Sequence, residues 1–396
     1  MRLTTALFAL AALVGTASSR FLLVGSQTSG ATTNDPVGIS IYRTDAAGGL
    51  TKIGQETGST TGGEPTYFAL SNDQKYLYVT NELGNGRLTA FRVRRDNNDG
   101  GNRDGDNHGG VNCEDDSNDE DVNKDKLSLD LLGSTATNTK GPVHVVLTND
   151  NKYAIVASYS DGSVVVFKLN QNSTVGEIVD KVQFKGGAAS YGTQSGPHAH
   201  CVALSKDNSY LYVTDLGNDK IMQFKLNKGK LTANGFVDTG RGTLPRHLAV
   251  HPNGDVIFLI TERTNELVRY EVQSNGQLYK PETVKTSEKK GKQYGAAVHV
   301  TKDGKFVLVS NRGLGNSKNS ENNIVVFDAA TLERVSTGLL PVGAYPRDFT
   351  ISDDNIVYVG NQHTSNIVSF RLLENGALVS TGTNFDVPKP VVLLTL

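Results

Sequence analysis

The chain has 396 residues, in which 39 Lys and Arg stand against 41 Asp and Glu, and its formal net charge is −2 at pH 7. This balance provides no basic surface for a nucleic acid or an anionic membrane, so neither is expected as a partner. The 42 glycines, together with many Val, Leu, Thr and Tyr, favour turns and strands over helices.

The N-terminal stretch has the layout of a secretory signal peptide. A positive charge at Arg2 is followed by an apolar run over residues 7–14 and by small residues, 15–19, that suit cleavage. The apolar run is too short to cross a bilayer comfortably. We therefore predict a signal peptide over residues 1–19 and a secreted, extracellular protein that begins at residue 20.

A repeated unit organises the rest of the chain, and residues 196–219 show it clearly. A polar turn with His198 and His200 leads into an apolar strand, a short turn and a second strand that ends at Asp215. A period of about fifty residues that contains only strands is typical of propeller blades. Apart from one longer interval, the short turns start 46 to 57 residues apart, at Ser71, Thr148, Ser205, His251, Thr301 and Ser352.

Counting these units predicts an all-β fold, a seven-bladed β-propeller over residues 20–396. Six units have both strands, whereas residues 21–25 supply a second strand without a first and residues 388–396 a first strand without a second. Pairing the C-terminal strand with the N-terminal blade closes the ring and removes two exposed edges. Third strands end in aromatic residues that we expect to pack between blades: Phe91, Phe167, Phe224, Tyr270, Phe327 and Phe370.

An acidic insertion, at about residues 95–126, lengthens one interval between repeats. It is rich in Asn and Gly and nearly free of apolar residues, so it is predicted to be disordered. A calcium loop is a weaker alternative, because the final Glu and both flanking helices are missing. Its candidate ligands and turn residue are Asp104, Asp106, His108, Gly109 and Asp115.

The two cysteines differ in their surroundings. Cys113 lies in the insertion and Cys201 on a predicted strand. Secretion permits a disulfide between them. We favour an unpaired Cys201, because a free thiol behaves as a small apolar group when a strand buries it.

Polar and charged residues gather at one end of the predicted blades. First strands start, and second strands end, on the same face of a propeller around its central channel. Charges in one mouth need pairing or solvent, so a catalytic or anion-binding cleft explains them better than structure alone. We expect His144 and His247 to be structural. Asp215 could instead cap a turn, and Glu82 could instead pair with an arginine across the mouth; both of these alternatives stay open. The other members are Thr66, Tyr159, His198, His200, Arg246, Glu262, Arg312, Arg347 and Gln362.

The motifs at this mouth resemble those of the seven-bladed lactonase family, which includes bacterial-type 6-phosphogluconolactonases and fungal carboxymuconate lactonizing enzymes. They are Gly-Pro-His-Ala-His at 196–200, Pro-Arg-His at 245–247, Thr-Glu at 261–262, Asn-Arg-Gly at 311–313 and Pro-Arg-Asp-Phe at 346–349. The resemblance spans residues 21–396 apart from the insertion. It implies that His198, Arg246, Glu262 and Arg312 form the active site. We expect His200, Arg347, Glu82, Asp215 and Gln362 to bind the substrate.

These residues suit the hydrolysis of a lactone. Arg246 and Arg312 are fixed cations for a developing oxyanion or for a substrate carboxylate or phosphate. Glu262 or His198 can take a proton from water while the other returns one to the ring oxygen, and a neighbouring arginine makes Glu262 the weaker base. No Ser or Cys nucleophile is arranged for a covalent intermediate. No cofactor is expected, and the spacing of His198, His200 and Asp215 is only weak support for a metal.

The sequence therefore predicts a secreted lactonase, similar to 6-phosphogluconolactonase, that hydrolyses a small anionic lactone of a sugar acid. The physiological substrate, the direction of reaction and the oligomeric state stay open at this point. One alternative is a cycloisomerase of the carboxymuconate type. The other is a non-enzymatic binding propeller in the extracellular space, which the export signal favours because the family's named metabolic substrates are intracellular.

Overall fold

The computed structural model describes residues 21–28, 38–96, 126–187, 196–288, 293–313, 321–339 and 343–396. The predicted signal peptide, residues 1–19, lies outside these ranges. No helix within the ranges is long and apolar enough to cross a membrane. Also outside them are Cys113 and the calcium-loop candidates Asp104, Asp106, His108, Gly109 and Asp115.

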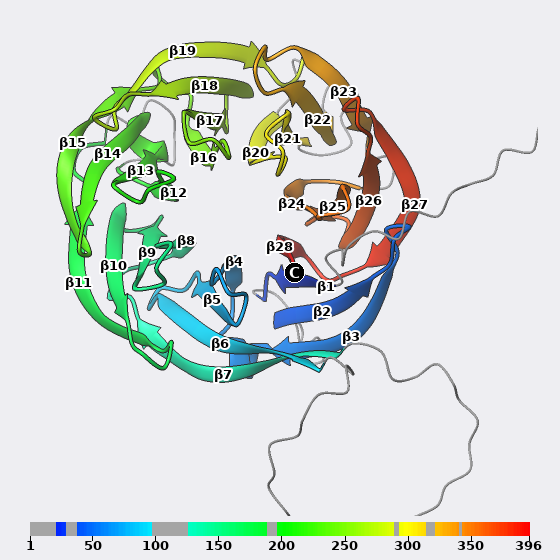
Figure 1. The fold of residues 1–396 in the computed structure, drawn as a ribbon, viewed down its shortest axis with the longest axis horizontal. Coiled ribbons are helices and arrows are strands. Elements are labelled where there is room, and N and C mark those ends of the chain that lie inside the picture. Colours follow the sequence, from blue (N-terminus) through cyan, green and yellow to red (C-terminus); the bar gives the residue numbers. More distant parts are fainter. Residues whose placement is uncertain are drawn as a thin grey trace, which may run out of the picture.

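Seven four-stranded antiparallel sheets stand as blades around a central axis (Figure 1). The predicted all-β, seven-bladed propeller is therefore confirmed. The first strand of each blade lies nearest the axis and the fourth forms the outer rim (Figure 1). Helical structure among the described residues is confined to the short α1 (Gly58–Thr61) and a single 3-10 turn, Leu216–Asn218.

The blades are numbered here in chain order, each given from its inner to its outer strand. Blade 1 contains β28 (Pro390–Thr395), β1 (Phe21–Ser26), β2 (Gly38–Thr44) and β3 (Leu50–Thr57), and blade 2 contains β4 (Pro65–Leu70), β5 (Tyr76–Asn81), β6 (Arg87–Asp96) and β7 (Lys126–Ala136). Blade 3 contains β8 (Pro142–Leu147), β9 (Tyr153–Ser158), β10 (Ser163–Leu169) and β11 (Val175–Gln183), and blade 4 contains β12 (Ala199–Leu204), β13 (Tyr210–Asp215), β14 (Lys220–Asn227) and β15 (Lys230–Asp238). Blade 5 contains β16 (Pro245–Val250), β17 (Val256–Thr261), β18 (Glu266–Val272) and β19 (Leu278–Lys285). Blade 6 contains β20 (Gln293–Val300), β21 (Phe306–Gly313), β22 (Asn323–Asp328) and β23 (Arg334–Leu339), and blade 7 contains β24 (Pro346–Ile351), β25 (Ile356–Asn361), β26 (Asn366–Leu372) and β27 (Leu378–Asp386).

The two ends of the described chain close the ring, as predicted. β28 supplies the inner strand of blade 1 and pairs antiparallel with β1, with Leu23 opposite Leu394. The backbones of Phe21 and Leu396 extend the ladder through two further hydrogen bonds, of 3.3 and 3.0 Å. Closed in this way, the ring gives β1 a partner on each side, and β28 becomes the inner strand of a complete blade.

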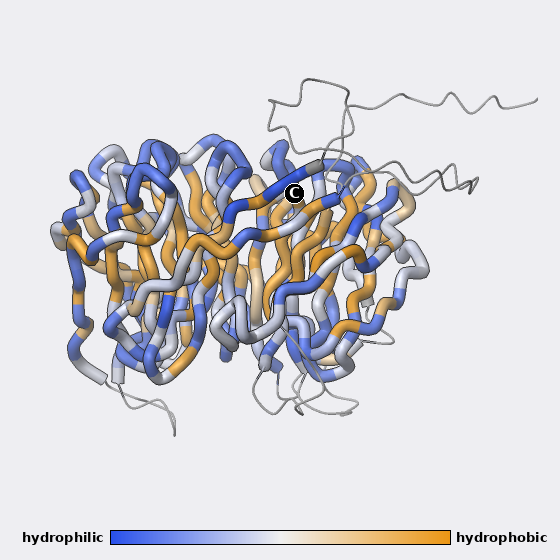
Figure 2. The backbone as a smooth tube through the Cα atoms, turned by 90° about the horizontal axis from the view of Figure 1, so that it is seen from below, coloured by the Kyte–Doolittle hydropathy of each residue, from blue (hydrophilic) through white to orange (hydrophobic). Residues whose placement is uncertain are grey.

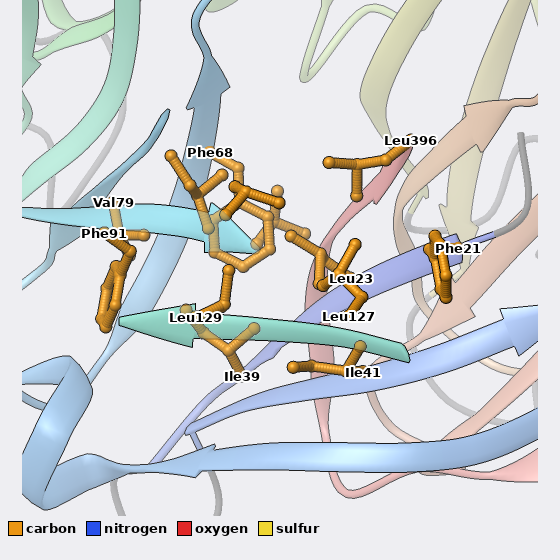
Figure 3. Packing of buried hydrophobic residues seen from close by; sticks show 13 residues of the cluster. Phe21, Leu23, Ile39, Ile41, Phe68, Val79, Phe91, Leu127, Leu129 and Leu396 are labelled. Carbon is orange, nitrogen blue, oxygen red and sulfur yellow. The ribbon is translucent and has the colours of Figure 1, made fainter. Parts of the chain in front are cut away.

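Apolar side chains between neighbouring blades form the core. Phe91 of blade 2 packs in one cluster with Phe21 and Leu23 of blade 1 (Figure 3). The third-strand aromatic residues of blades 3 to 7 are buried in the same way against the blade before them, which confirms the predicted packing role. In a side view, apolar strands fill the body of the ring and hydrophilic turns cover both faces (Figure 2).

The hairpin β6–β7 is longer than the sequence indicated. Arg95 pairs with Leu127 and Asp96 with Lys126, so these residues belong to strands rather than to the insertion. A strand ladder uses only main-chain groups, and charged residues can therefore continue it beyond the last apolar position. The predicted insertion, 95–126, narrows to residues 97–125, which lie outside the described residues.

Candidate active site

A strained turn leads into the first strand of five blades. The residue before the first-strand proline, called the turn residue here, has a positive φ in each of them. Residues other than glycine rarely adopt a positive φ, and a proline that follows restricts the backbone of the residue before it further. Because four of the five are not glycine, tertiary contacts must hold the turn. The turn residues are Glu64 (40°), Gly141 (62°), Leu244 (55°), Tyr345 (65°) and Lys389 (36°).

Each turn residue accepts a hydrogen bond from the backbone N–H of the residue that follows the second strand, called the rim residue here. The main chain therefore brings the rim side chains to corresponding places around the mouth, whatever their chemistry. The bonds run from Glu82 to Glu64 (3.0 Å), Tyr159 to Gly141 (2.7 Å), Glu262 to Leu244 (2.7 Å), Gln362 to Tyr345 (3.1 Å) and Gln27 to Lys389 (3.0 Å).

Blade 4 departs from this pattern. Ala199, rather than Pro197, takes the proline position and pairs with Asp215 across the hairpin. The N–H of Leu216 donates to the carbonyl of His198 at 2.9 Å, so His198 itself is the turn residue of this blade. Blade 4 thus presents a histidine at the position of the turn residue, without the proline that follows it in the five blades with the strained turn.

The carboxylate of Asp215 is committed to this turn. It accepts hydrogen bonds from the N–H of His198 (2.9 Å) and from the backbone and side-chain nitrogens of Asn218 (3.2 and 2.6 Å). Asp215 lies one position before the rim residue and is fully buried. These contacts give it the turn-capping role that the sequence left open, and they orient His198. No three His, Cys, Asp or Glu side chains of the described residues come together as a metal site.

One carboxylate holds two guanidinium groups at the centre of the mouth. Oε2 of Glu262 lies 2.9 Å from Nη2 of Arg312 and 3.3 Å from Nε of Arg246. Both arginines are almost fully buried, with 2% and 3% of their side-chain surface exposed, and each also donates to a backbone carbonyl, of Ala296 and Gly295 respectively. Burial, followed by the charges of Arg312 and Arg347, lowers the pKa of Arg246 to about 9. The group remains cationic at neutral pH, and an incoming anion would relieve the repulsion.

The contacts of His198 fix the orientation of its ring. Its Nδ1 lies 2.9 Å from the carbonyl oxygen of Tyr159, and its ring stacks on that tyrosine with centroids 4.4 Å apart. A carbonyl oxygen only accepts hydrogen bonds, so we assign the proton of the neutral ring to Nδ1. The lone pair is then on Nε2, which is the nitrogen left to receive a proton from water.

Three further histidines, His144, His200 and His247, form a buried group beneath the mouth. The ring centroids of His200 and His247 are 5.1 Å apart, and those of His247 and His144 are 5.6 Å apart. Burial lowers the pKa of all three, to about 3 for His144, and the charge of Arg246 lowers them further. They are therefore neutral at physiological pH. His144 also stacks on Tyr67 with centroids 3.7 Å apart, which fits the structural role expected for it.

His200 differs from the other two histidines in its place on the strand. It lies at the irregular position of the first strand of its blade, where blades 5 and 7 carry Arg246 and Arg347. Its Nδ1 is buried and has no hydrogen-bond partner among the described residues. A polar atom in that condition is normally satisfied by water or a ligand. This observation supports the prediction that His200 faces substrate.

The remaining predicted residues also lie on the mouth. Gln362 donates from Nε2 to Oε1 of Gln27 at 2.7 Å, and its own Oε1 is buried without a partner among the described residues. Arg347 is partly buried and makes no hydrogen bond or ion pair with another described residue. Burial raises the pKa of Glu82, and the charge of Arg347 opposes that rise.

Sequence reasoning missed Tyr345, which supports Arg312. The guanidinium carbon of Arg312 lies 4.9 Å from the Tyr345 ring centroid, and its Nη1 lies 3.4 Å from the tyrosine hydroxyl. The ring also stacks on His363, with centroids 4.0 Å apart and planes 9° apart. The available signal was its place directly before Pro346, where it is the turn residue of blade 7.

We expect Tyr345→Leu to lower kcat/KM on the enzyme's substrate about 2- to 30-fold, because a cation–π contact of about 0.5–2 kcal/mol no longer holds Arg312 in place. Tyr345→Phe keeps the ring and is expected to retain most of the activity. Steady-state kinetics of the two variants measure the difference. Equal losses in both would assign the effect to the hydroxyl and contradict a role for the ring.

The fold and the site together define a closed seven-bladed propeller with a cationic mouth on one face. The chain belongs to the lactonase family, whose model, described as "Lactonase, 7-bladed beta-propeller", matches residues 21–114 and 118–395.

Individual relatives carry names consistent with this family. The chain is 28% identical over 335 residues to the 6-phosphogluconolactonase of Bacillus subtilis, which covers 83% of this chain and 86% of the relative. The solved periplasmic gluconolactonase of Pseudomonas aeruginosa is 25% identical, with a TM-score of 0.76 over 95% of this chain and 98% of its own. A putative 6-phosphogluconolactonase structure from Bacteroides uniformis, at 23% identity, has a TM-score of 0.77 over 95% and 99% of the two chains, which shows the shared fold.

Proposed function

We propose that the protein is a lactonase that hydrolyses the lactone of an anionic sugar acid. The observation that carries the proposal is the pair of guanidinium groups, Arg246 and Arg312, held on Glu262 in the same mouth as His198. The names of the relatives from Bacillus subtilis and Pseudomonas aeruginosa support this class of reaction.

In the proposed reaction the lactone carbonyl lies against Arg246 and Arg312. Fixed, desolvated cations stabilise the oxyanion that forms when water attacks the carbonyl carbon, and they need no reorganisation as the charge develops. Nε2 of His198 accepts a proton from the attacking water. Glu262 has a positioning role, because its carboxylate is engaged by both guanidinium groups and keeps them side by side.

An arginine without an ion-pair partner among the described residues supports an anionic substrate. Of the mouth's arginines, Arg246 and Arg312 are paired with Glu262, whereas Arg347 is paired with no described residue. Arg347 is therefore available to a phosphate or carboxylate on the substrate, which a guanidinium can bind through two hydrogen bonds.

We propose further that the enzyme works outside the cytoplasm, after removal of residues 1–19. The layout of this segment supports export. The similar protein from Pseudomonas aeruginosa is named a periplasmic gluconolactonase, so an exported lactonase of this fold has a parallel. Sequencing the N-terminus of the protein recovered from culture medium tests this proposal, and an intact Met1 in a cell-retained protein would contradict it.

A lactone panel tests the activity. The purified protein is titrated in a pH-stat with gluconolactone and phosphorylated gluconolactone, and the spontaneous rate is subtracted. We expect acid release by the parent protein and a loss of about 10²–10⁴-fold in kcat for His198→Ala, because the proton acceptor is gone. His251→Gln is the matched control, since His251 bonds to Gly304 and Asn253 on the opposite, hairpin-turn face.

The same panel separates the alternatives. A change in ultraviolet absorbance with carboxymuconate, without hydrolysis of any lactone, would identify a cycloisomerase. Saturable binding of a sugar acid without turnover would identify a binding propeller. Hydrolysis that His198→Ala leaves intact would contradict the assignment of the base.

A further inference from the structure

Two glutamates hold equivalent positions on the mouth. Glu82 follows β5 and Glu262 follows β17, and each donates its backbone N–H to the turn residue of its own blade, at 3.0 and 2.7 Å. They sit on blades 2 and 5, three blades apart around the ring. The main chain thus aims two carboxyl groups at one mouth from well-separated directions.

Their surroundings differ sharply. Glu262 touches two guanidinium groups through a single oxygen. The carboxyl group of Glu82 makes no hydrogen bond or ion pair with another described residue, although the residue is partly buried. Burial raises the pKa of Glu82 first, the charge of Arg347 lowers it, and the neighbouring Glu64 raises it again. Two carboxyl groups with such different partners are suited to different tasks in one reaction.

We infer that Glu82 is the general acid that protonates the ring oxygen of the lactone as the ring opens. The inference rests on the proposed lactonase function. Glu82 occupies the same rim position as Glu262, which contacts Arg246 at 3.3 Å, so the carboxyl group and the arginine share one mouth. Glu262 is unsuited to the task, because its carboxyl group is already engaged by Arg246 and Arg312.

The step balances as follows. The oxygen of water bonds to the acyl carbon while its proton moves to Nε2 of His198. The bond between the acyl carbon and the ring oxygen then breaks, its electron pair goes to the ring oxygen, and that oxygen takes the proton of the Glu82 carboxyl group. The proton on His198 returns to Glu82 through solvent, and the hydroxy acid leaves. An alkoxide is a poor leaving group, so its protonation is worth a large part of the rate.

The test is the pH dependence of kcat on a lactone that the parent protein hydrolyses, with the spontaneous rate subtracted. Because the acid must be protonated, we expect kcat to fall as pH rises through the raised pKa of Glu82. Glu82→Gln should lower kcat about 10²–10⁴-fold, change KM far less and remove this alkaline decline, whereas Glu82→Asp should keep it.

Glu64→Gln is a second variant, which changes the charge beside Glu82 and leaves Glu82 itself in place. The side-chain amide oxygen of the substituted glutamine can still accept the hydrogen bond that Thr28 donates to Glu64 at 2.9 Å, but the negative charge of the carboxylate is gone. Since that charge raises the pKa of Glu82, its removal should move the alkaline decline to lower pH.

Three results would overturn the inference: a kcat within tenfold of the parent in Glu82→Gln, a loss confined to KM, or an alkaline decline that survives in that variant. Each of them leaves the lactonase proposal intact. A parent protein that hydrolyses no lactone would instead contradict the proposed function on which the inference rests.

Discussion

Arg246→Met is expected to abolish lactone hydrolysis and, at the same time, to raise the melting temperature. The loss of activity follows from the loss of one of two fixed cations at the developing oxyanion, which is worth about 10²–10³-fold in kcat. The gain in stability has a separate cause. Arg246 is buried, has repulsive neighbours in Arg312 and Arg347, and its Nε makes no hydrogen bond among the described residues.

Met fills a similar volume without charge, so the desolvation cost of a buried cation and its repulsion with Arg312 and Arg347 are both removed. Glu262 is not stranded by the change, because Arg312 still contacts it at 2.9 Å. A substitution that lowers activity and raises stability identifies a residue that is retained for function, whereas the loss of a structural ion pair would lower stability.

Kinetics and thermal unfolding of the same preparations measure the two effects. Arg269→Met is the matched control, since Arg269 pairs with Glu282 at 3.6 Å on the outer strands, where the partner is half-exposed. We expect this control to retain activity and to change stability by less than about 1 kcal/mol. A melting temperature that falls together with activity in Arg246→Met would contradict the interpretation and make Arg246 a structural residue.

Mild acid is expected to destabilise the fold strongly through His144, His200 and His247. Their pKa values in the folded protein lie below the ordinary value of 6.5, at about 3 for His144. At pH values between the lowered pKa values of the folded protein and the ordinary value of 6.5, the unfolded chain binds protons that the folded protein does not. Stability is therefore complete above about pH 6.5 and is lost as pH falls through this window, by about 1.4 kcal/mol per pH unit for each histidine.

Urea unfolding at pH 6.5, 6.0, 5.5 and 5.0 measures this slope in a range where most carboxylates are still ionised. His144→Gln removes one of the three groups and should reduce the slope by about a third. The variant is expected to be less stable than the parent at pH 7, because the stack on Tyr67 is lost. An unchanged slope in this variant would show that His144 accepts a proton in the folded state and would contradict the prediction.

The inner three strands of each blade were predictable because packing on both faces requires continuous apolar runs. β9 and β10 are buried at nearly every position, and their sequences are correspondingly rich in Ala, Ile and Val. The outer strands give no such signal. β15 alternates between exposed and partly buried residues, and its Phe236 is 53% exposed. Such a strand is formed by hydrogen bonding to a preformed neighbour rather than by its own hydrophobicity.

The candidate site was only partly predictable. Arg246, Glu262 and Arg312 were found because equivalent places in successive repeats carry different charged groups. The hydrogen-bond partners of Asp215 and the unpaired Nδ1 of His200 were not predictable, since they depend on contacts that form only in the folded blade.

By itself the sequence determined the number of blades, the closure of the ring by its two ends and the identity of the charged residues, because period, strand hydrophobicity and turn chemistry are local properties of the chain. The tertiary structure alone decided which charges meet. Glu262 joins Arg246 to Arg312 of the next blade, while Glu82 stays unpaired among the described residues. These relations depend on hydrogen bonds between turn and rim residues and on contacts across the axis, which join positions that are distant in sequence and come together only when the ring closes.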